Sequence, residues 1–568
     1  MSDPPQAAAP SEPAPPGRAR HRRLARRTAL VSGLTLISRV LGYVREVVSA
    51  ALFGDRSGVY DAFITAWRVP NLFRRFLGEG ALSTSFQTAL TAVDADHGEE
   101  AGRTLFLSTL RVLLGLLVGL CLVVMALVAL APDRMPVTGW AWLGKDPAEV
   151  RELTLRVMPF VVFVCVAALT TGALHVRGFF AAPSIAPAAM NVVWIGALFV
   201  VAARFGWSAD VPVEGLSADP VARGVAGELR HLEMVRTLAW GVLLAGTVQL
   251  AVQWPALRAA GFLGRGRPAP LPAGAPRPGD VLRRAAPLAL GAAVYQINVM
   301  VDGLMAEGLL SDGGPTLHYF ANRVQQFPLA LIAIAATSAV FPALQQLGHE
   351  RDLASLRRLH DRTHIAVAAV ALPAAAGLFA LSTPVVQVSF ERGAFGAEGV
   401  QRTADALRVL CIAILPAGAT GLVARTYYAM GDYVTPVKVS VAMLALNAGL
   451  NAWFLVGLGM DVDGLAAATT ITSALNVVLL LPGLTRTLGL PRSEVRVLPR
   501  FGRILAASAV CAVVAGTTEV TLDGPCGRTV ALFAAIGAGA AAYAAVAQWI
   551  GVDEVRALVA KVRARFSR

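Results

Sequence analysis

The stretch SRVLGYVREVVSAALFG, residues 38–54, is typical of a membrane-spanning helix, although it contains Arg39, Arg45 and Glu46. Its other residues are mostly apolar, and it follows a leader rich in arginine. An ionised side chain at the centre of a bilayer costs about 2.5–3.5 kcal/mol on insertion scales, and such residues usually face a cavity or one another. We therefore expect the fold to give these charges a polar interior within the membrane.

Length and composition place the whole chain among helical membrane proteins. The sequence has 568 residues, of which 55% are hydrophobic and only 15% charged, and its mean hydropathy is +0.60. A soluble chain of this length carries more charge. About fourteen apolar segments approach or exceed the ~20 residues that cross a bilayer, which predicts an all-α polytopic fold with about 14 transmembrane helices. The segments lie roughly at 29–53, 59–91, 105–131, 152–178, 183–204, 235–258, 283–310, 316–347, 363–388, 403–429, 434–458, 463–485, 500–518 and 528–551.

Basic residues lie mainly in loops on one side of the predicted membrane. The net charge is +13, but Lys and Arg cluster between apolar segments, as in the cytoplasmic loops of membrane proteins, which argues against nucleic-acid binding. The loops 459–462 and 519–527, predicted to lie outside, contain neither residue. An even number of helices then places both termini in the cytoplasm.

A Pro/Gly-rich stretch divides the chain. GRGRPAPLPAGAPRPGD, residues 264–280, is typical of a linker between two helical bundles. We predict a disordered basic leader at 1–28, an N-terminal lobe at 29–258, a cytoplasmic linker at 259–282, a C-terminal lobe at 283–487, and two C-terminal helices with a basic tail at 488–568.

The second apolar segment contains a stripe of charged residues. Its members are Asp61, Arg68, Arg75 and Glu79. They fall on one helical face because steps of seven or four residues nearly complete whole turns. Two acids and two bases on one face neutralise one another, so the stripe predicts ion pairs or a gate.

A second group of arginines lies in or beside the predicted membrane segments. Arg39 and Arg74 have no acid three or four residues away, and Gly42 permits a break that turns Arg39 and Arg45 toward one space. Guanidinium groups bind phosphate oxygens through paired hydrogen bonds. We therefore predict a hydrated cavity in which Arg39, Arg45, Arg74 and Arg323 bind a diphosphate. The alternative is that they extend to lipid headgroups or form structural pairs.

Polar residues in three later segments favour a small monovalent cation. Asn298 and Asp302 lie four residues apart, as do Asn447 and Asn451, and Thr469 lies in the next segment. A lone carboxylate in an apolar helix is typical of a cation or proton site. Interhelical hydrogen bonding explains the same residues equally well.

No motif indicates a cofactor, a metal ion or a catalytic nucleophile. The five cysteines form no CxxC pair, GWAWLGKD at 139–146 lacks the Ser or Thr of a phosphate-binding loop, and HDRTH at 360–364 lacks a zinc-protease glutamate. We expect no enzyme activity, no metal and no cofactor. A cation gradient, protons or the membrane potential is the expected energy source.

Five stretches are similar to the MurJ (MviN) lipid II flippases of the multidrug/oligosaccharidyl-lipid/polysaccharide exporter superfamily. They are SRVLGYVRE, DAFITAWRVPNLFRRFLGEGALSTSF, ANRVQQFP, FERGAF and GDYVTPVKV, and the resemblance spans roughly residues 29–490. It implies two six-helix lobes plus two C-terminal helices, alternating access, and transfer of a lipid-linked peptidoglycan precursor across the bacterial inner membrane.

The same resemblance implies roles for single residues. The diphosphate-binding arginines of the family align with Arg39, Arg45, Arg74 and Arg323, and an acid needed for function aligns with Asp61. The family often has acids beside the arginine of the eighth segment, whereas this chain has Asn322 and Gln326. We therefore expect Arg323 to be less neutralised here.

The sequence thus predicts a lipid II flippase whose ligand is lipid II or a similar polyprenyl-diphosphate lipid, with cell-wall synthesis proteins as candidate partners. An exporter of another polyprenyl-diphosphate oligosaccharide would use the same arginines. A drug exporter is disfavoured, because it would need acids and aromatic residues in its cavity. A non-transporting scaffold for cell-wall enzymes would tolerate loss of the buried charges.

Overall fold

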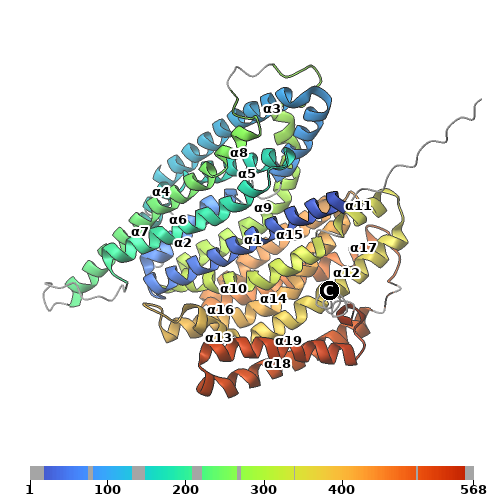
Figure 1. Cartoon of the computed structure of the whole chain (residues 1–568). Coiled ribbons are helices and arrows are strands. Elements are labelled where there is room, and N and C mark those ends of the chain that lie inside the picture. Colours follow the sequence, from blue (N-terminus) through green and yellow to red (C-terminus); the bar gives the residue numbers. More distant parts are fainter. Residues whose placement is uncertain are drawn as a thin grey trace, which may run out of the picture.

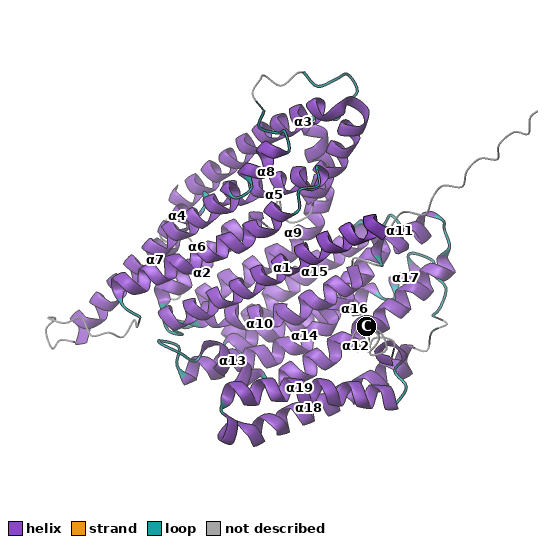
Figure 2. Cartoon of the chain, in the orientation of Figure 1, coloured by secondary structure: helices purple, strands orange, loops and turns teal. Residues whose placement is uncertain are grey.

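A computed structural model describes residues 18–74, 81–130, 147–207, 220–264, 270–337, 340–493, 495 and 497–556 (Figure 1). Residues 1–17, Arg75 and Glu79, for which the sequence makes predictions, lie outside these ranges. Helices and short connections make up the described residues, with no strand among them (Figure 2). The prediction of an all-α fold is confirmed.

The first group of helices packs mainly within itself, with α6 between α1 and α7 and with α5 between α3 and α7. Its core contains large buried side chains such as Phe86, Phe106 and Phe160. The helices are α1 (Arg18–Phe53), α2 (Gly58–Phe73), α3 (Ala81–Leu130), α4 (Pro147–Val157), α5 (Phe160–Val176), α6 (Ala181–Phe205), α7 (Pro220–Ala251) and α8 (Trp254–Ala259).

The second group is built around α14, which packs against α10, α12 and α16. The last two helices pack against each other and against α12, at the edge of the molecule (Figure 1). The helices are α9 (Pro278–Leu309), α10 (Gly314–Thr337), α11 (Phe341–His349), α12 (Leu353–Ala380), α13 (Ser382–Phe390), α14 (Ala397–Ala429), α15 (Val434–Ala452), the π-helix η4 (Trp453–Gly457), α16 (Val462–Leu480), α17 (Gly483–Arg486), α18 (Val497–Cys526) and α19 (Arg528–Trp549). The exact domain limits stay predictions.

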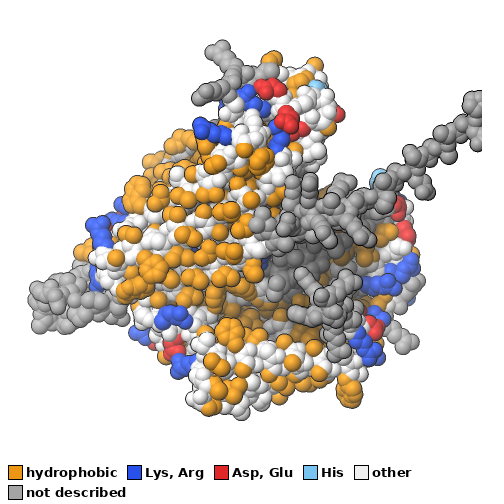
Figure 3. Space-filling view, viewed as in Figure 1, with side chains coloured by type: hydrophobic (Ala, Val, Ile, Leu, Met, Phe, Trp, Pro, Cys, Tyr) orange, Lys and Arg blue, Asp and Glu red, His pale blue; other side chains and the backbone are white. Residues whose placement is uncertain are grey.

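Ten helical stretches within the described residues are long and apolar enough to cross a membrane. Apolar side chains cover the broad middle of the face in Figure 3, and charged side chains gather toward its ends. Four more helices, α1, α2, α9 and α10, contain the charged residues that interrupt apolar sequence. This arrangement is compatible with the predicted fourteen helices and confirms a polytopic membrane protein.

Helix α1 begins earlier than the sequence predicts. It starts at Arg18, so the prediction of a disordered leader is wrong for residues 18–28. Between Arg18 and Gly33 the chain has neither Pro nor Gly, and its many Arg, Ala and Leu residues have high helix propensity. Nothing in this sequence therefore stops the first membrane helix from continuing toward its N-terminus.

The two helix groups meet where α9 packs against α2 and α3, and also at one end of their interface, which we call the closed end. It comprises residues 51–61, 311–316 and 391–398. The Ala394 amide donates to the Ala51 carbonyl at 3.0 Å. Gly393 has φ +60°, and a Cβ there would lie 2.2 Å from the same carbonyl oxygen, so this approach requires glycine. Arg56 and Glu398 form an ion pair across the same boundary.

Candidate functional site

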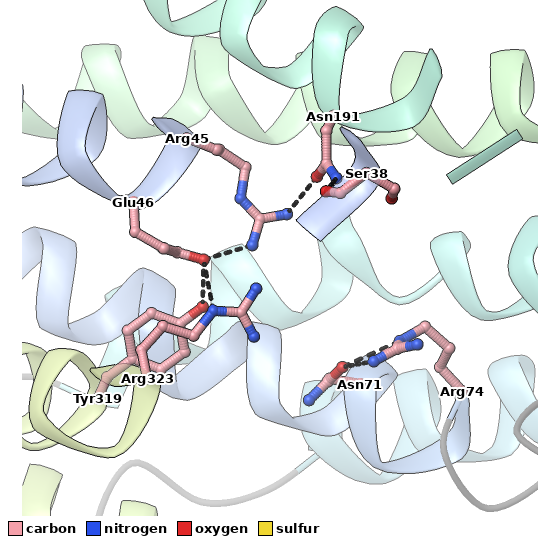
Figure 4. A network of polar contacts seen from close by, with 8 residues as sticks. All are labelled: Ser38, Arg45, Glu46, Asn71, Arg74, Asn191, Tyr319 and Arg323. Carbon is pink, nitrogen blue, oxygen red and sulfur yellow. Dashed lines mark hydrogen bonds and ion pairs between the residues drawn. The ribbon is translucent and has the colours of Figure 1, made fainter. Parts of the chain in front are cut away.

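Arg45 is buried where α1 meets α6. Its guanidinium forms an ion pair with Glu46, the next residue of the same helix, and donates to the Asn191 side chain at 3.3 Å (Figure 4). It also lies 4.3 Å from the centre of the Trp194 ring, a cation–π contact. The structural pairing that the sequence left open for these arginines is therefore present for Arg45.

Glu46 is shared with the second helix group. Arg323 of α10 places its Nε 3.6 Å from Glu46 Oε1, and the Tyr319 hydroxyl donates to the same oxygen at 2.9 Å. The Arg323 side chain remains 30% exposed, whereas that of Glu46 is 3% exposed. Gly42 faces this arginine, since a Cβ built there would lie 3.5 Å from Arg323 Nη2.

Helix α10 offers no acid next to Arg323, but another helix supplies one. Asn322 donates instead to the His318 carbonyl at 3.0 Å, and the carboxylate beside Arg323 comes from α1. The sequence-based reasoning missed this acid because it counted only neighbours along one helix, and the expectation that Arg323 is less neutralised than in the family stays a prediction. A carboxylate that contacts two guanidinium groups still leaves the cluster with net positive charge.

Arg74 follows the last residue of α2. Its Nε and Nη2 atoms both donate to Asn71 Oδ1 at 3.0 Å. In Figure 4 the Arg323 guanidinium extends toward this pair from the other helix group. Glu46 joins Arg45 of α1 to Arg323 of α10, and Arg74 at the end of α2 appears beside them in this view. We call these three arginines the arginine cluster.

The structure does not bring Arg39 into the arginine cluster. Its side chain is exposed, and it makes no hydrogen bond or ion pair with the described part of the chain. The neighbouring Ser38 carbonyl accepts from Asn191 Nδ2 at 3.0 Å (Figure 4). Helix α1 runs unbroken from Arg18 to Phe53, through Gly42. The predicted break that would turn Arg39 and Arg45 toward one space is thus absent from α1 as described.

Asp61 caps α10 rather than joining a stripe along α2. Its carboxylate accepts from the Gly313 amide at 2.6 Å and from the Thr316 amide and hydroxyl at 3.0 and 2.6 Å. A buried carboxylate at a helix N-terminus satisfies free amides and interacts favourably with the helix dipole. Arg68 donates instead to the Val299 carbonyl of α9. The predicted pairing along α2 is therefore wrong for its two described members, and Arg75 and Glu79 lie outside the described residues.

We expect Asp61→Ala to loosen the closed end, because it removes three hydrogen bonds between the helix groups. Loss of such a capping carboxylate costs about 0.5–2 kcal/mol. Spin labels at Cys replacing Arg56 and Glu398, in a Cys526→Ser background, should report one short distance in the parent and an added longer one in the variant. Asp405→Asn, within the second group, is the control. An unchanged distance distribution would contradict this role of Asp61.

The predicted cation-site residues converge on the Asp302 carboxylate. It accepts from Asn298 at 3.1 Å, from Asn451 at 2.7 Å and from the Thr469 hydroxyl at 3.4 Å. Asn451 also donates to Asn447 at 3.1 Å. These contacts join α9, α15 and α16 within the second helix group.

One feature of this convergence favours an ion over hydrogen bonding alone. Asn451 Oδ1 is buried and accepts no hydrogen bond from the described residues. A buried acceptor without a donor is unfavourable unless water or a cation occupies the site. Carboxylate, amide and hydroxyl oxygens are suitable ligands for hard cations. The residues therefore fit a small cation, and that role stays a prediction.

Sequence reasoning missed the residues that complete these sites. Glu46 stands beside Arg45 in the opening stretch, so its charge was visible, but its contact with Arg323 depends on tertiary structure. Asn191 and Tyr319 gave no signal, because single polar or aromatic residues in apolar segments are common. Glu307, which accepts from Thr65 at 2.8 Å, was visible as a second acid in the same helix as Asp302.

Fold and site together define a polytopic helical membrane protein of the transporter class, with charged residues enclosed between two helix groups. The profile described as lipid II flippase MurJ matches residues 49–532. The chain belongs to this MurJ family.

Relatives and solved structures agree with this assignment. A probable lipid II flippase MurJ of Vibrio cholerae is 30% identical over 94% of this chain and 97% of its own length. The lipid II flippase MurJ of Burkholderia cenocepacia is 30% identical over 80% of this chain and 83% of its own length.

Two solved structures share the fold. A lipid II flippase MurJ in an inward closed conformation has a TM-score of 0.68 at 19% identity, covering 92% of this chain and 99% of that one. An inward-facing multidrug resistance MATE family transporter of the MOP superfamily has a TM-score of 0.62 at 13% identity, covering 82% and 99%. At these identities the likeness concerns the fold.

Proposed function

We propose that this chain is a lipid II flippase that moves its substrate from the inner to the outer leaflet by alternating access. The main support is the arginine cluster, in which guanidinium groups from both helix groups surround one buried carboxylate. Within the arginine cluster, Arg323 is the residue best placed to exchange Glu46 for a substrate anion, because its contact with Glu46 is 3.6 Å long and its side chain is partly exposed. Guanidinium groups recognise the oxygens of a diphosphate.

A bound diphosphate would change the contacts within this cluster. It carries more negative charge than Glu46 and would compete with that carboxylate for Arg323. Contacts to Arg74 on the first helix group and to Arg323 on the second would draw α2 and α10 together. The substrate itself thus would stabilise closure of the side from which it entered. The polyprenyl tail would remain in lipid.

The proposal also specifies how the chain is oriented in the membrane. With both termini in the cytoplasm of a bacterial inner membrane, the predicted topology places the loops at 54–57, 311–313 and 391–396 outside. These loops all belong to the closed end. The interface would therefore be closed toward the outside and receptive toward the inside. The hydrated cavity around the arginines and the cell-wall synthesis partners are further parts of the proposal.

Liposome reconstitution tests the proposed activity directly. Full-length protein is reconstituted with lipid II that bears a fluorophore, and a membrane-impermeant reductant destroys fluorescence in the outer leaflet. We expect transfer well above protein-free liposomes. Equal rates with and without protein would contradict the proposal and favour a scaffold. Transfer of another labelled polyprenyl-diphosphate oligosaccharide, but not of lipid II, would favour the related exporter.

Replacing Asp302 with asparagine tests the proposed cation coupling. A unit charge pair about 4 Å apart is worth about 4 kcal/mol at an effective dielectric constant of about 20, so we expect at least a roughly tenfold higher Na⁺ requirement for transfer. Rates are compared in sodium and choline buffers of equal ionic strength, with Asp405→Asn as the control. The same Na⁺ requirement in Asp302→Asn and the parent would show that Asp302 only forms hydrogen bonds.

A further inference from the structure

Arg68 is a buried cation between α2 and α9. One nitrogen, Nη1, donates to the Val299 carbonyl of α9 at 3.1 Å. The Nε and Nη2 atoms are buried and donate to no group in the described ranges. Arg68 forms no ion pair there either, so its positive charge is not cancelled by a directly contacting carboxylate.

Gly303 fixes the position of this side chain. A Cβ at residue 303 would lie 2.3 Å from Arg68 Cδ and 2.4 Å from its Cζ and Nε atoms. The guanidinium therefore lies flat against the backbone of α9, in a space that exists because residue 303 has no side chain. Residue 302, next along α9, is the acid at the centre of the cation cluster.

The surrounding charges make Arg68 sensitive to this acid. The carboxylates whose charges act on Arg68 are those of Asp302, Glu307 and Asp61, and Asp302 is the one next to Gly303, against which the guanidinium lies. Glu307 accepts a hydrogen bond from Thr65, and Asp61 is occupied by the N-terminus of α10. Asp302 is therefore the principal electrostatic partner of Arg68. A cation bound to Asp302 would neutralise the negative charge of its carboxylate.

We propose that Arg68 is a positioning residue that transmits the charge state of Asp302 to α2. This inference rests on the proposed function, because it requires a cation at Asp302. Without the cation, Asp302 attracts Arg68 and holds α2 against α9. With the cation bound, this attraction is lost and α2 is released. Arg68 lies seven residues from Asp61 at the closed end and six from Arg74 in the arginine cluster.

The proposal predicts a definite sign for one measurement. Arg68 and the cation repel each other, so neutral Arg68→Gln should bind Na⁺ more tightly than the parent. We expect the midpoint of a Na⁺ titration to fall about tenfold, within the usual range for coupled sites. A purely structural role would lower stability without moving this midpoint downward.

The experiment follows thermal stability of the purified full chain while Na⁺ replaces choline at constant ionic strength. Arg68→Lys, which keeps the charge, and Arg204→Gln, which removes a charge on α6, should both keep the parental midpoint. Asp302→Asn should lose the response. If Arg68→Gln does not fold, Gly303→Ala, which displaces the guanidinium, should lower the midpoint in the same direction.

Two results would overturn the coupling. One is an unchanged or higher midpoint in the folded Arg68 or Gly303 variant, and the other is absence of any Na⁺ response in the parent. Neither result concerns lipid II transfer, which the liposome assay measures separately. Failure of this inference is therefore distinguishable from failure of the proposed flippase activity.

Discussion

Replacing Arg323 with glutamine is expected to lower lipid II transfer about tenfold or more, because a hydrogen bond to a charged group contributes about 1.5–3 kcal/mol. Arg323 supplies the partly exposed guanidinium of the second helix group, so its loss leaves a diphosphate without a link between α2 and α10. Initial rates of transfer in liposomes, at equal amounts of folded protein, are the measurement.

A matched control separates this effect from general loss of charge. Arg408 lies on α14, pairs with Asp405, and has a side chain 35% exposed, close to the 30% of Arg323. Arg408→Gln should transfer lipid II at nearly the parental rate. If both variants retained that rate, Arg323 would have no place in substrate binding. If both lost activity equally, the effect would be one of stability.

Replacing Arg45 with glutamine is expected to destabilise the protein strongly, by about 3–5 kcal/mol, because it leaves Glu46 as a buried charge without its principal partner. The variant also loses the contact of the guanidinium with the Trp194 ring and its hydrogen bond to Asn191. We expect a large fall in the melting temperature of the purified protein. Any fall in transfer would then follow from lost structure as well as lost charge.

The double variant Arg45→Gln with Glu46→Gln tests this explanation. Removing both charges abolishes the unpaired carboxylate, so stability should recover in part. It should not recover fully, since Arg323 and the Tyr319 hydroxyl lose the carboxylate that they contact. A double variant no more stable than Arg45→Gln would contradict the assignment of Glu46 as the cause. Comparing these variants with Arg323→Gln therefore separates Arg45, whose role is structural, from Arg323, which is available to the substrate.

The sequence was sufficient for the general fold because each apolar segment is long enough to define a helix without tertiary information. The same reasoning brought the Asp302 cluster together correctly. Asn298 and Asp302 share one helical face, as do Asn447 and Asn451, and buried polar side chains in apolar helices satisfy one another across helix contacts. Periodicity within separate helices was thus enough to select residues that meet in space.

Contacts between helices limited the rest of the prediction. Asp61 and Arg68 share a face of α2, yet Asp61 binds α10 and Arg68 binds α9, because both lie where α2 contacts the second group. Glu46 similarly accepts contacts from α1 and α10. Neighbours along one helix follow from sequence spacing, whereas partners on another helix require knowledge of how the helices cross.

Native mass spectrometry of lipid II bound to the purified full-length protein tests the central claim most directly. The parent and Arg408→Gln should bind lipid II in preference to equal amounts of phosphatidylglycerol, which has one phosphate. Arg323→Gln should lose this preference while remaining folded. Equal preference for lipid II in the parent and in folded Arg323→Gln would contradict a diphosphate site built on the arginine cluster.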